Sequence, residues 1–181
     1  MARPGGSLTS RLLAPLAGLA LAGALIAGCA PAPGTAATVN GQVIGEREVA
    51  TAVEELSHFF GPVPPTEVIT YLVAAPEMID VAADAGFGMS ESDAVGTLDR
   101  LAAQNGVDPI EASEPTLLVV RSLLASSALQ SDPEAAALMT EVGDRVAGLD
   151  VTISPRYGTW DGQAIAEPSF DWIEVPAPAG A

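Results

Sequence analysis

The chain has 181 residues, and its 7 basic residues stand against 23 acidic ones, which gives a formal net charge of -16. Such an acidic surface repels a phosphate backbone, because nucleic-acid affinity rests on basic side chains displacing counterions, so we expect no nucleic-acid partner. With 49% hydrophobic but only 4% aromatic residues, the composition excludes disorder along the whole length and predicts a core of aliphatic side chains.

The first 28 residues have the layout of a secretory signal peptide. Arg3 and Arg11 precede an apolar run over residues 12–26, which is shorter than the ~20 residues that a spanning helix needs. Residues 25–29 read LIAGC and resemble the lipobox of bacterial lipoproteins. This resemblance implies cleavage before Cys29, a diacylglycerol on its thiol, and anchoring at the extracytoplasmic face of the cell membrane. The alternative is a signal peptide that is cut elsewhere and leaves Cys29 as a free thiol.

We expect four segments along the chain. Residues 1–28 form the signal peptide, and residues 29–37, rich in alanine and proline, form a lipidated tether. Residues 38–160 form the folded domain, and residues 161–181 form a Pro- and Ala-rich tail. The part that starts at Cys29 keeps five basic and all 23 acidic residues, so the exported protein is still more acidic than the whole chain, with a formal charge of -18.

The folded domain opens with a hairpin and two helices. Residues 38–44 (TVNGQVI) place Asn-Gly between two β-prone pairs, which is the pattern of a tight turn between strands. From Glu46 onward, apolar residues recur every three or four positions until a Gly-Pro pair, which predicts an amphipathic helix. A second helix opens at residues 64–66 (PPT) and runs toward Gly86, and we expect Pro76 to break or kink it.

Three further helices and a strand follow. Ser90 and Asp93 form a capping pattern at the start of a third helix, which ends at an Asn-Gly pair. Residues 115–130 carry apolar side chains on several sides, which predicts a central, buried helix. Residues 132–133 (DP) are expected to cap and open a fifth helix, and residues 151–153 to form a strand.

The expected fold class is therefore mainly α. It is a bundle of about five helices, with a small two-stranded β element that joins the N- and C-terminal ends of the domain. We expect residues 39–44 to pair with residues 151–153 and so to close the domain end to end.

Five segments of the chain follow one another in a known order: residues 37–44 (ATVNGQVI), 68–73 (VITYLV), 82–86 (AADAG), 89–95 (MSESDAV) and 153–160 (ISPRYGTW). In this order they resemble the N-terminal domain of the SurA family of periplasmic chaperones, especially its lipoprotein relatives from actinobacteria, over about residues 37–160. The resemblance implies a domain that binds extended apolar segments of unfolded exported proteins. Many members also carry a parvulin-type prolyl isomerase domain, for which this chain has no room, so we carry over the binding role alone.

The chain is short of residues for catalysis. His58 is the only histidine and Cys29, the only thiol, is assigned to lipid, so we expect no enzyme, no cofactor and no metal site. A structural or surface role is expected for His58, near the negative end of its helix. Three groups of carboxylates could bind calcium or supply acid–base chemistry, but a solvated acidic face is the favoured interpretation. These groups are Glu54 and Glu55, then Asp80 and Asp84, and then Asp108, Glu111 and Glu114.

Aromatic and methionine side chains are the candidates for polypeptide binding. Met78, Met89 and Met139 either line an adaptable groove or fill the core, and the core interpretation is favoured. Tyr157 and Trp160 would lie on opposite sides of an extended segment, one packed inward and one facing a partner. The five residues that we single out for peptide binding are Phe59, Phe60, Met78, Tyr157 and Trp160.

Three functional hypotheses follow from the sequence. The first is a membrane-anchored lipoprotein with a chaperone-like domain that assists the folding of exported proteins. The second is a non-enzymatic scaffold or accessory lipoprotein that docks on one envelope partner, with its acidic surface giving electrostatic specificity. The third is a foldase with an unrecognised isomerase activity.

Overall fold

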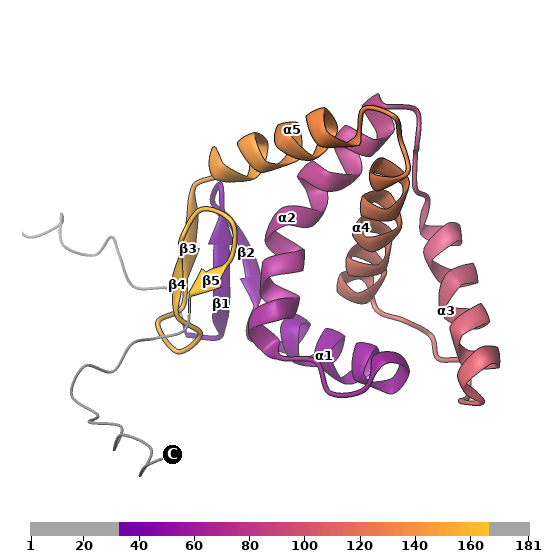
Figure 1. Ribbon diagram of the computed structural model, residues 1–181. Helices are drawn as coiled ribbons and strands as arrows, with labels where there is room; N and C mark the ends of the chain where they lie inside the picture. Colours follow the sequence, from indigo (N-terminus) through magenta and orange to yellow (C-terminus); the bar gives the residue numbers. More distant parts are fainter. Residues whose placement is uncertain (1–32, 167–181) are drawn as a thin grey trace, which may run out of the picture. The chain divides into compact units, whose positions relative to one another are not determined.

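The computed structural model describes residues 33–166, which form a mainly α-helical domain, as expected (Figure 1). A hairpin precedes the five helices of this part, and short strands follow them. In chain order the elements are β1 (Thr35–Val39), β2 (Gln42–Gly45), α1 (Glu46–Phe60), α2 (Pro65–Asp84), α3 (Glu91–Asn105), α4 (Glu114–Gln130), α5 (Ala135–Ala147), β3 (Val151–Ile153), β4 (Thr159–Trp160) and β5 (Ile165–Ala166).

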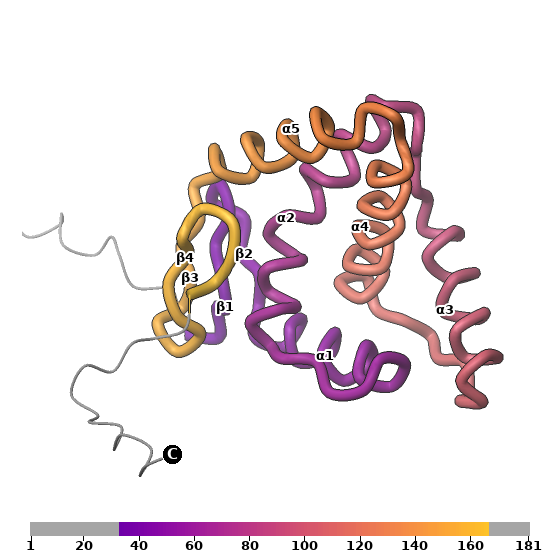
Figure 2. The backbone as a smooth tube through the Cα atoms, viewed as in Figure 1, coloured from indigo at the N-terminus to yellow at the C-terminus, as the bar shows by residue number. Residues whose placement is uncertain are grey.

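One small sheet joins the two ends of the domain. Strand β1 pairs antiparallel with β2 on one edge and with β3 on the other, so the sheet closes the domain end to end but has three strands and not two. The residues that pair with β3 are 37–39, and not the expected 39–44. Asn40 and Gly41 make the β1–β2 turn with φ angles of 49° and 82°, both positive as a type I′ turn requires. The side-chain oxygen of Asn40 accepts a hydrogen bond at 2.9 Å from the amide of Asp150, 110 residues away. Figure 2 shows β1 and β3 running side by side.

Regular structure extends past the expected domain at both ends. Strand β1 begins at Thr35, inside the segment 29–37 that was expected to be a tether, and its first three residues are buried. Strand β5 lies inside the segment 161–181 that was expected to be a tail, and pairs antiparallel with β4. The approach of β5 requires a glycine at Gly158, because a Cβ there would lie 2.1 Å from the Ala166 carbonyl oxygen. Both boundaries were wrong because such short strands are specified by their partners and carry no periodicity of their own.

The first two helices have the predicted bounds, but Pro76 does not interrupt α2. The amide of Gly45 donates a hydrogen bond at 2.6 Å to the carboxylate of Glu48 and so caps α1. Helix α2 continues from Pro65 through Pro76 to Asp84, so the expected break is absent. Pro76 is exposed, whereas Ala75 and Ile79 on adjoining turns are buried. Packing on the buried side therefore holds the helix together across the missing N–H group.

The starts of α3 and α5 differ in how well the sequence predicted them. The Ser90 hydroxyl accepts a hydrogen bond from the Asp93 amide at 3.2 Å, and the Ser90 amide donates to the Asp93 carboxylate at 2.8 Å, so the capping box is confirmed. The Ser90 hydroxyl also donates to the Asp93 carboxylate, and this hydrogen bond, followed by the one from the Ser90 amide, lowers the pKa of Asp93. Helix α5 begins later than predicted, at Ala135, because the Asp132 carboxylate accepts a hydrogen bond from the Glu134 amide at 2.7 Å and closes a turn first.

Helix α4 is central, as its broad apolar surface predicted, and packs against the other four helices. The main core combines α1, α3, the first halves of α2 and α4, and the inner face of the sheet, with Ile69 fully buried within it. The small core combines α5 with the second halves of α2 and α4, and Leu129 is fully buried there. Within residues 33–166, no helix combines the length and the apolar character that are needed to cross a bilayer.

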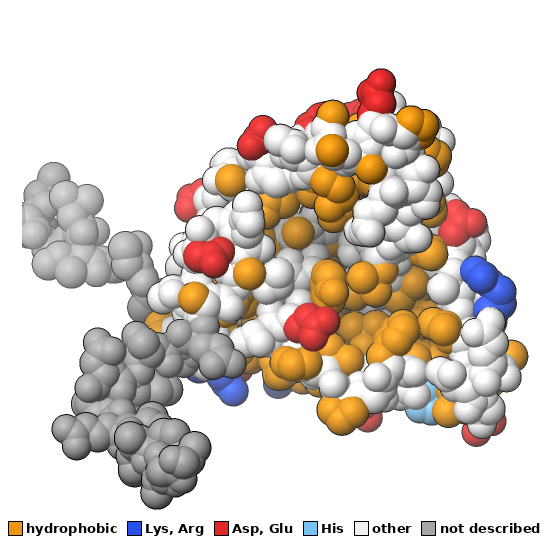
Figure 3. Space-filling view, in the orientation of Figure 1, with side chains coloured by type: hydrophobic (Ala, Val, Ile, Leu, Met, Phe, Trp, Pro, Cys, Tyr) orange, Lys and Arg blue, Asp and Glu red, His pale blue; other side chains and the backbone are white. Residues whose placement is uncertain are grey.

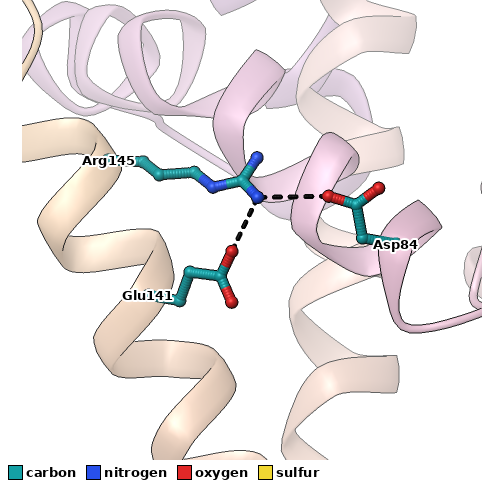
Figure 4. Close-up of polar contacts among 3 residues, drawn as sticks. All are labelled: Asp84, Glu141 and Arg145. Carbon is teal, nitrogen blue, oxygen red and sulfur yellow. Dashed lines mark hydrogen bonds and ion pairs between the residues drawn. The ribbon is translucent and has the colours of Figure 1, made fainter.

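An ion-pair group on the surface joins α5 to α2. One guanidinium nitrogen of Arg145 lies 2.6 Å from a Glu141 oxygen and 3.1 Å from an Asp84 oxygen (Figure 4). The hydrogen bonds that Arg145 donates to Glu141 and, to a smaller extent, to Asp84 raise the pKa of Arg145. All three side chains are accessible to solvent, so the group orients α5 more than it stabilises the fold.

Candidate functional site

An apolar groove of about 220 Å³ lies between α1, α2 and α4. Figure 3 shows hydrophobic side chains gathered in the hollow between α1 and α4 on this face of the molecule. Three helices and the loop between α1 and α2 contribute to its walls, so the groove exists only in the folded domain. Its lining residues are Leu56, Phe60, Val63, Glu67, Tyr71, Val119 and Leu123.

Two of these side chains present a large apolar surface to solvent. Phe60 is 52% exposed and Leu123 is 36% exposed, whereas Phe59 is only 6% exposed and belongs to the main core. Consecutive residues of a helix point about 100° apart, so the end of α1 directs one phenyl ring inward and the next into the groove. Of the two aromatic residues singled out on α1, Phe60 lines the groove, whereas Phe59 is buried in the main core and does not.

Hydrogen bonds fix the end of α1 that carries Phe60. The side-chain Nδ2 of Asn105 in α3 donates at 3.0 Å to the Phe59 carbonyl oxygen. The Val63 amide donates to the hydroxyl of Ser57 at 3.3 Å, which holds the wall of the groove in the α1–α2 loop. Contacts from another helix and from the loop therefore set the position of the Phe60 ring.

The polar edge of the groove consists of Glu67 and Tyr71, one turn apart on α2. Burial raises the pKa of the Tyr71 phenol, and the nearby Glu67 carboxylate raises it further. Near neutral pH the phenol is therefore protonated, and its hydroxyl can donate either to the Glu67 carboxylate or to a bound group. This edge offers polar partners beside an apolar floor.

A second, separate hollow adjoins the groove on the side of the β4–β5 hairpin. It has a volume of about 400 Å³, and we call it the hairpin pocket. Because Glu67 and Tyr71 line both hollows, the groove and the hairpin pocket meet at these two side chains. The remaining lining residues of the hairpin pocket are Pro64, Thr66, Thr70, Ala164 and Ile165.

The other candidates for peptide binding lie outside the groove. Met78, Met89 and Met139 are partly buried and pack against the small core, which is the interpretation that the sequence favoured. Tyr157 and Trp160 both pack partly against the main core, instead of one facing inward and one outward. The structure therefore does not bring Met78, Tyr157 or Trp160 together with Phe60.

His58 makes a structural contact. Its Nε2 atom lies 2.9 Å from the carbonyl oxygen of Asp108, in the loop between α3 and α4, and its ring meets Phe59 edge-on at 5.0 Å between centroids. In the part of the chain that the structure describes, no three His, Cys, Asp or Glu side chains are arranged to hold a metal ion.

One carboxylate has a role that the sequence analysis missed. Glu55 was placed on a solvated acidic face, but its carboxylate accepts hydrogen bonds at 2.9 and 2.8 Å from the amide and hydroxyl of Ser113. Ser113 is the N-cap of α4, so an acid on α1 holds the positive end of the central helix. Asp84 pairs with Arg145. The remaining candidate carboxylates are exposed, as expected: Glu54, Asp80, Asp108, Glu111 and Glu114.

Sequence reasoning found Phe60 but missed most of the groove. Leu56 and Leu123 belong to the apolar faces predicted for their helices, whereas Val63, Glu67 and Val119 were not singled out. A signal did exist in α4, where apolar residues occupy more of the circumference than a buried stripe needs, so that one of them, Leu123, reaches the surface.

The chain matches no protein-family model, no curated protein and no solved structure. Cys29, the residue expected to carry lipid, lies outside the described residues.

Proposed function

We propose that this chain is a membrane-anchored extracytoplasmic lipoprotein whose helical domain binds apolar segments of exported polypeptides and assists their folding without catalysing a reaction. The observation that carries the proposal is the groove in which Phe60 and Leu123 expose apolar side chains. Exposed apolar surface around a hollow is typical of sites that bind other proteins.

The size of the groove favours side chains of a polypeptide over a whole small molecule. Its volume of about 220 Å³ is below the ~300–1,000 Å³ that small-molecule pockets usually have. The Tyr71 hydroxyl can donate to a backbone carbonyl oxygen, and the Glu67 carboxylate can accept from a backbone amide. An extended segment could thus place apolar side chains on the floor and hydrogen-bond its backbone at the edge.

The walls of the groove support binding that is broad in sequence. Leu56, Val63, Val119 and Leu123 are aliphatic, and the attraction of aliphatic surface is non-directional. Such walls select for hydrophobicity and extended shape. The resemblance to SurA-type chaperones and the signal peptide with its lipobox at Cys29 support the same conclusion, since proteins are exposed as unfolded chains during export.

Suppression of aggregation by the purified chain tests the binding role. The chain should keep an unfolded, apolar client soluble, and Phe60→Glu and Leu123→Glu should each weaken this activity by roughly tenfold or more, because they place a charge on apolar surface. Val43→Glu is the matched control, since Val43 is 61% exposed on β2 and does not line the groove. Circular dichroism establishes that each variant is folded. Equal activity of all three variants and the unmodified chain would show that the groove does not bind the client.

Attachment to the membrane has its own test. Cys29→Ser should abolish incorporation of labelled palmitate and move the chain from the membrane fraction to the soluble extracytoplasmic fraction, because the thiol is the proposed site of acylation. Retention of the variant in membranes with unchanged labelling would contradict lipid anchoring through Cys29. The aggregation experiment on the groove does not depend on this result.

The acidic surface supports one alternative, a scaffold that docks on a single partner. The part of the chain from Cys29 onward has a formal charge of -18, which would steer it to a basic surface. A photo-crosslinking residue at position 123 separates the two functions in cells. Many unrelated exported proteins trapped there would support the chaperone role, and one folded envelope protein, held in a salt-sensitive complex, would support the scaffold.

A further inference from the structure

The residues that follow β5 are unusually apolar and aromatic for this chain. Residues 170–175 read FDWIEV. The whole chain has four phenylalanines, two tryptophans and two tyrosines, and this segment contains one phenylalanine and one tryptophan. Four of these six residues are apolar, and Asp171 and Glu174 are spaced between them. Such a segment has the composition that the proposed groove would bind.

The chain leaves the described domain beside the groove. Ile165 of β5 lines the hairpin pocket together with Glu67 and Tyr71, and the same two residues form the polar edge of the groove. Strand β5 also packs against α2, which carries Glu67 and Tyr71. A polypeptide that continues from Ala166 therefore starts near Glu67 and Tyr71, the two residues that the hairpin pocket shares with the groove.

The length of this polypeptide is sufficient for it to cross the groove. Nine residues separate Ala166 from the end of the segment at Val175, and an extended chain spans at most about 3.3–3.6 Å per residue, or roughly 30 Å. Short linkers also give an attached segment an effective concentration in the millimolar range, which few free ligands reach. An attached apolar segment is thus a strong competitor for its own groove.

We propose that residues 170–175 dock into the groove between α1, α2 and α4 of the same chain, with the phenyl or indole ring of Phe170 or Trp172 against Phe60 and Leu123. The segment then acts as a built-in occupant that an exported polypeptide must displace. The docking itself rests only on the groove, whereas the competition with polypeptides rests on the proposed function.

Fluorescence of Trp172 tests the docking in the full chain, reconstituted in phosphatidylcholine vesicles. Trp160→Phe leaves Trp172 as the only tryptophan, and a difference spectrum between the unmodified chain and its Trp172→Phe variant gives the same signal without changing Trp160, which packs on both cores. Docking predicts blue-shifted emission and slow quenching by acrylamide. Leu123→Glu should shift the emission to the red and raise quenching about twofold or more, while Val43→Glu leaves both unchanged.

Three results would overturn the docking. The first is emission typical of water-exposed tryptophan in the unmodified chain. The second is a blue shift that Leu123→Glu and Phe60→Glu do not alter, which would place Trp172 on the lipid. The third is a blue shift that disappears on dilution of the chain in the vesicles, which would assign the segment to the groove of a second copy.

Binding of a labelled apolar peptide separates this proposal from the proposed function. Removal of residues 167–181 should tighten binding by about tenfold or more, because the attached competitor is lost. If the peptide binds equally to both forms and Trp172 is exposed, the docking fails and the function stands. If Trp172 is docked but neither form binds the peptide, the function fails and the docking stands.

Discussion

The interior beneath α1 and the groove beside it are built from the same helices and similar residues, but only one of them excludes water. Phe59 and Phe60 are neighbours in sequence, and the first lies in the main core while the second lies at the surface. The difference comes from the surroundings of each ring. Phe59 packs against other side chains of the main core, whereas Phe60 borders the hollow between α1, α2 and α4. The comparison teaches that neighbouring apolar residues serve stability or binding according to their tertiary neighbours.

Truncation of the buried ring should have the largest effect. Phe59→Ala should lower the free energy of unfolding by about 3–5 kcal/mol, because it removes buried apolar surface and leaves a cavity in a packed core. Urea denaturation followed by circular dichroism measures this change. A loss below about 1 kcal/mol would contradict the assignment of Phe59 to the core.

The second prediction concerns the carboxylate that joins α1 to α4. Glu55→Ala should lower the free energy of unfolding by about 1.5–3 kcal/mol, because the amide and hydroxyl of Ser113 lose a charged acceptor. The neighbouring Glu54 is exposed, and Glu54→Ala should change stability by no more than about 0.5 kcal/mol. Equal effects of the two substitutions in the same denaturation experiment would show that the contact between Glu55 and the N-cap of α4 does not contribute to stability.

The ring in the groove should matter for binding and hardly at all for stability. Phe60→Ala should change the free energy of unfolding by no more than about 0.5 kcal/mol, since the side chain is half exposed. Affinity for a labelled apolar peptide, measured on the form that ends at Ala166, should fall more than about fivefold. Unfolding of this variant, or unchanged affinity, would remove the distinction between the two phenylalanines.

The smallest effect is expected at the polar edge of the groove. In a Tyr157→Phe background, the tyrosinate absorbance reports Tyr71 alone, and its pKa should lie above the ordinary value of 10.0. Because the folded-state pKa is raised, the associated stability is present below about pH 10 and is lost as the pH rises through the raised pKa. Glu67→Gln should lower the pKa but leave it above the ordinary value, since burial is the larger cause. A pKa at or below the ordinary value in the parent chain would place Tyr71 in open solvent.

Much of the fold could be predicted because its signals are local. The Asn-Gly turn, the capping box at Ser90 and the Gly-Pro pair after α1 each depend on backbone preferences within a few residues. The features that were missed depend on distant partners. Strand β5 exists through its pairing with β4, and α2 survives Pro76 because its other face is packed.

The site was harder to predict than the fold for the same reason. The sequence identified Phe60 as a candidate but equally proposed Phe59, Met78, Tyr157 and Trp160, which the structure buries or places elsewhere. Aromatic and methionine residues fill cores as readily as they line grooves, so residue type alone could not separate the two roles.

By itself, the sequence determined a mainly α domain, the positions of five helices, and a strand at each end that could close the fold. Periodicity and capping are properties of a few consecutive residues, and they carry this information. Only the tertiary structure decided that β1 pairs on both edges, that Glu55 caps α4, and that Phe60, Tyr71 and Leu123 share one groove. These outcomes depend on the angles and distances at which separate helices pack, which no short stretch of sequence specifies.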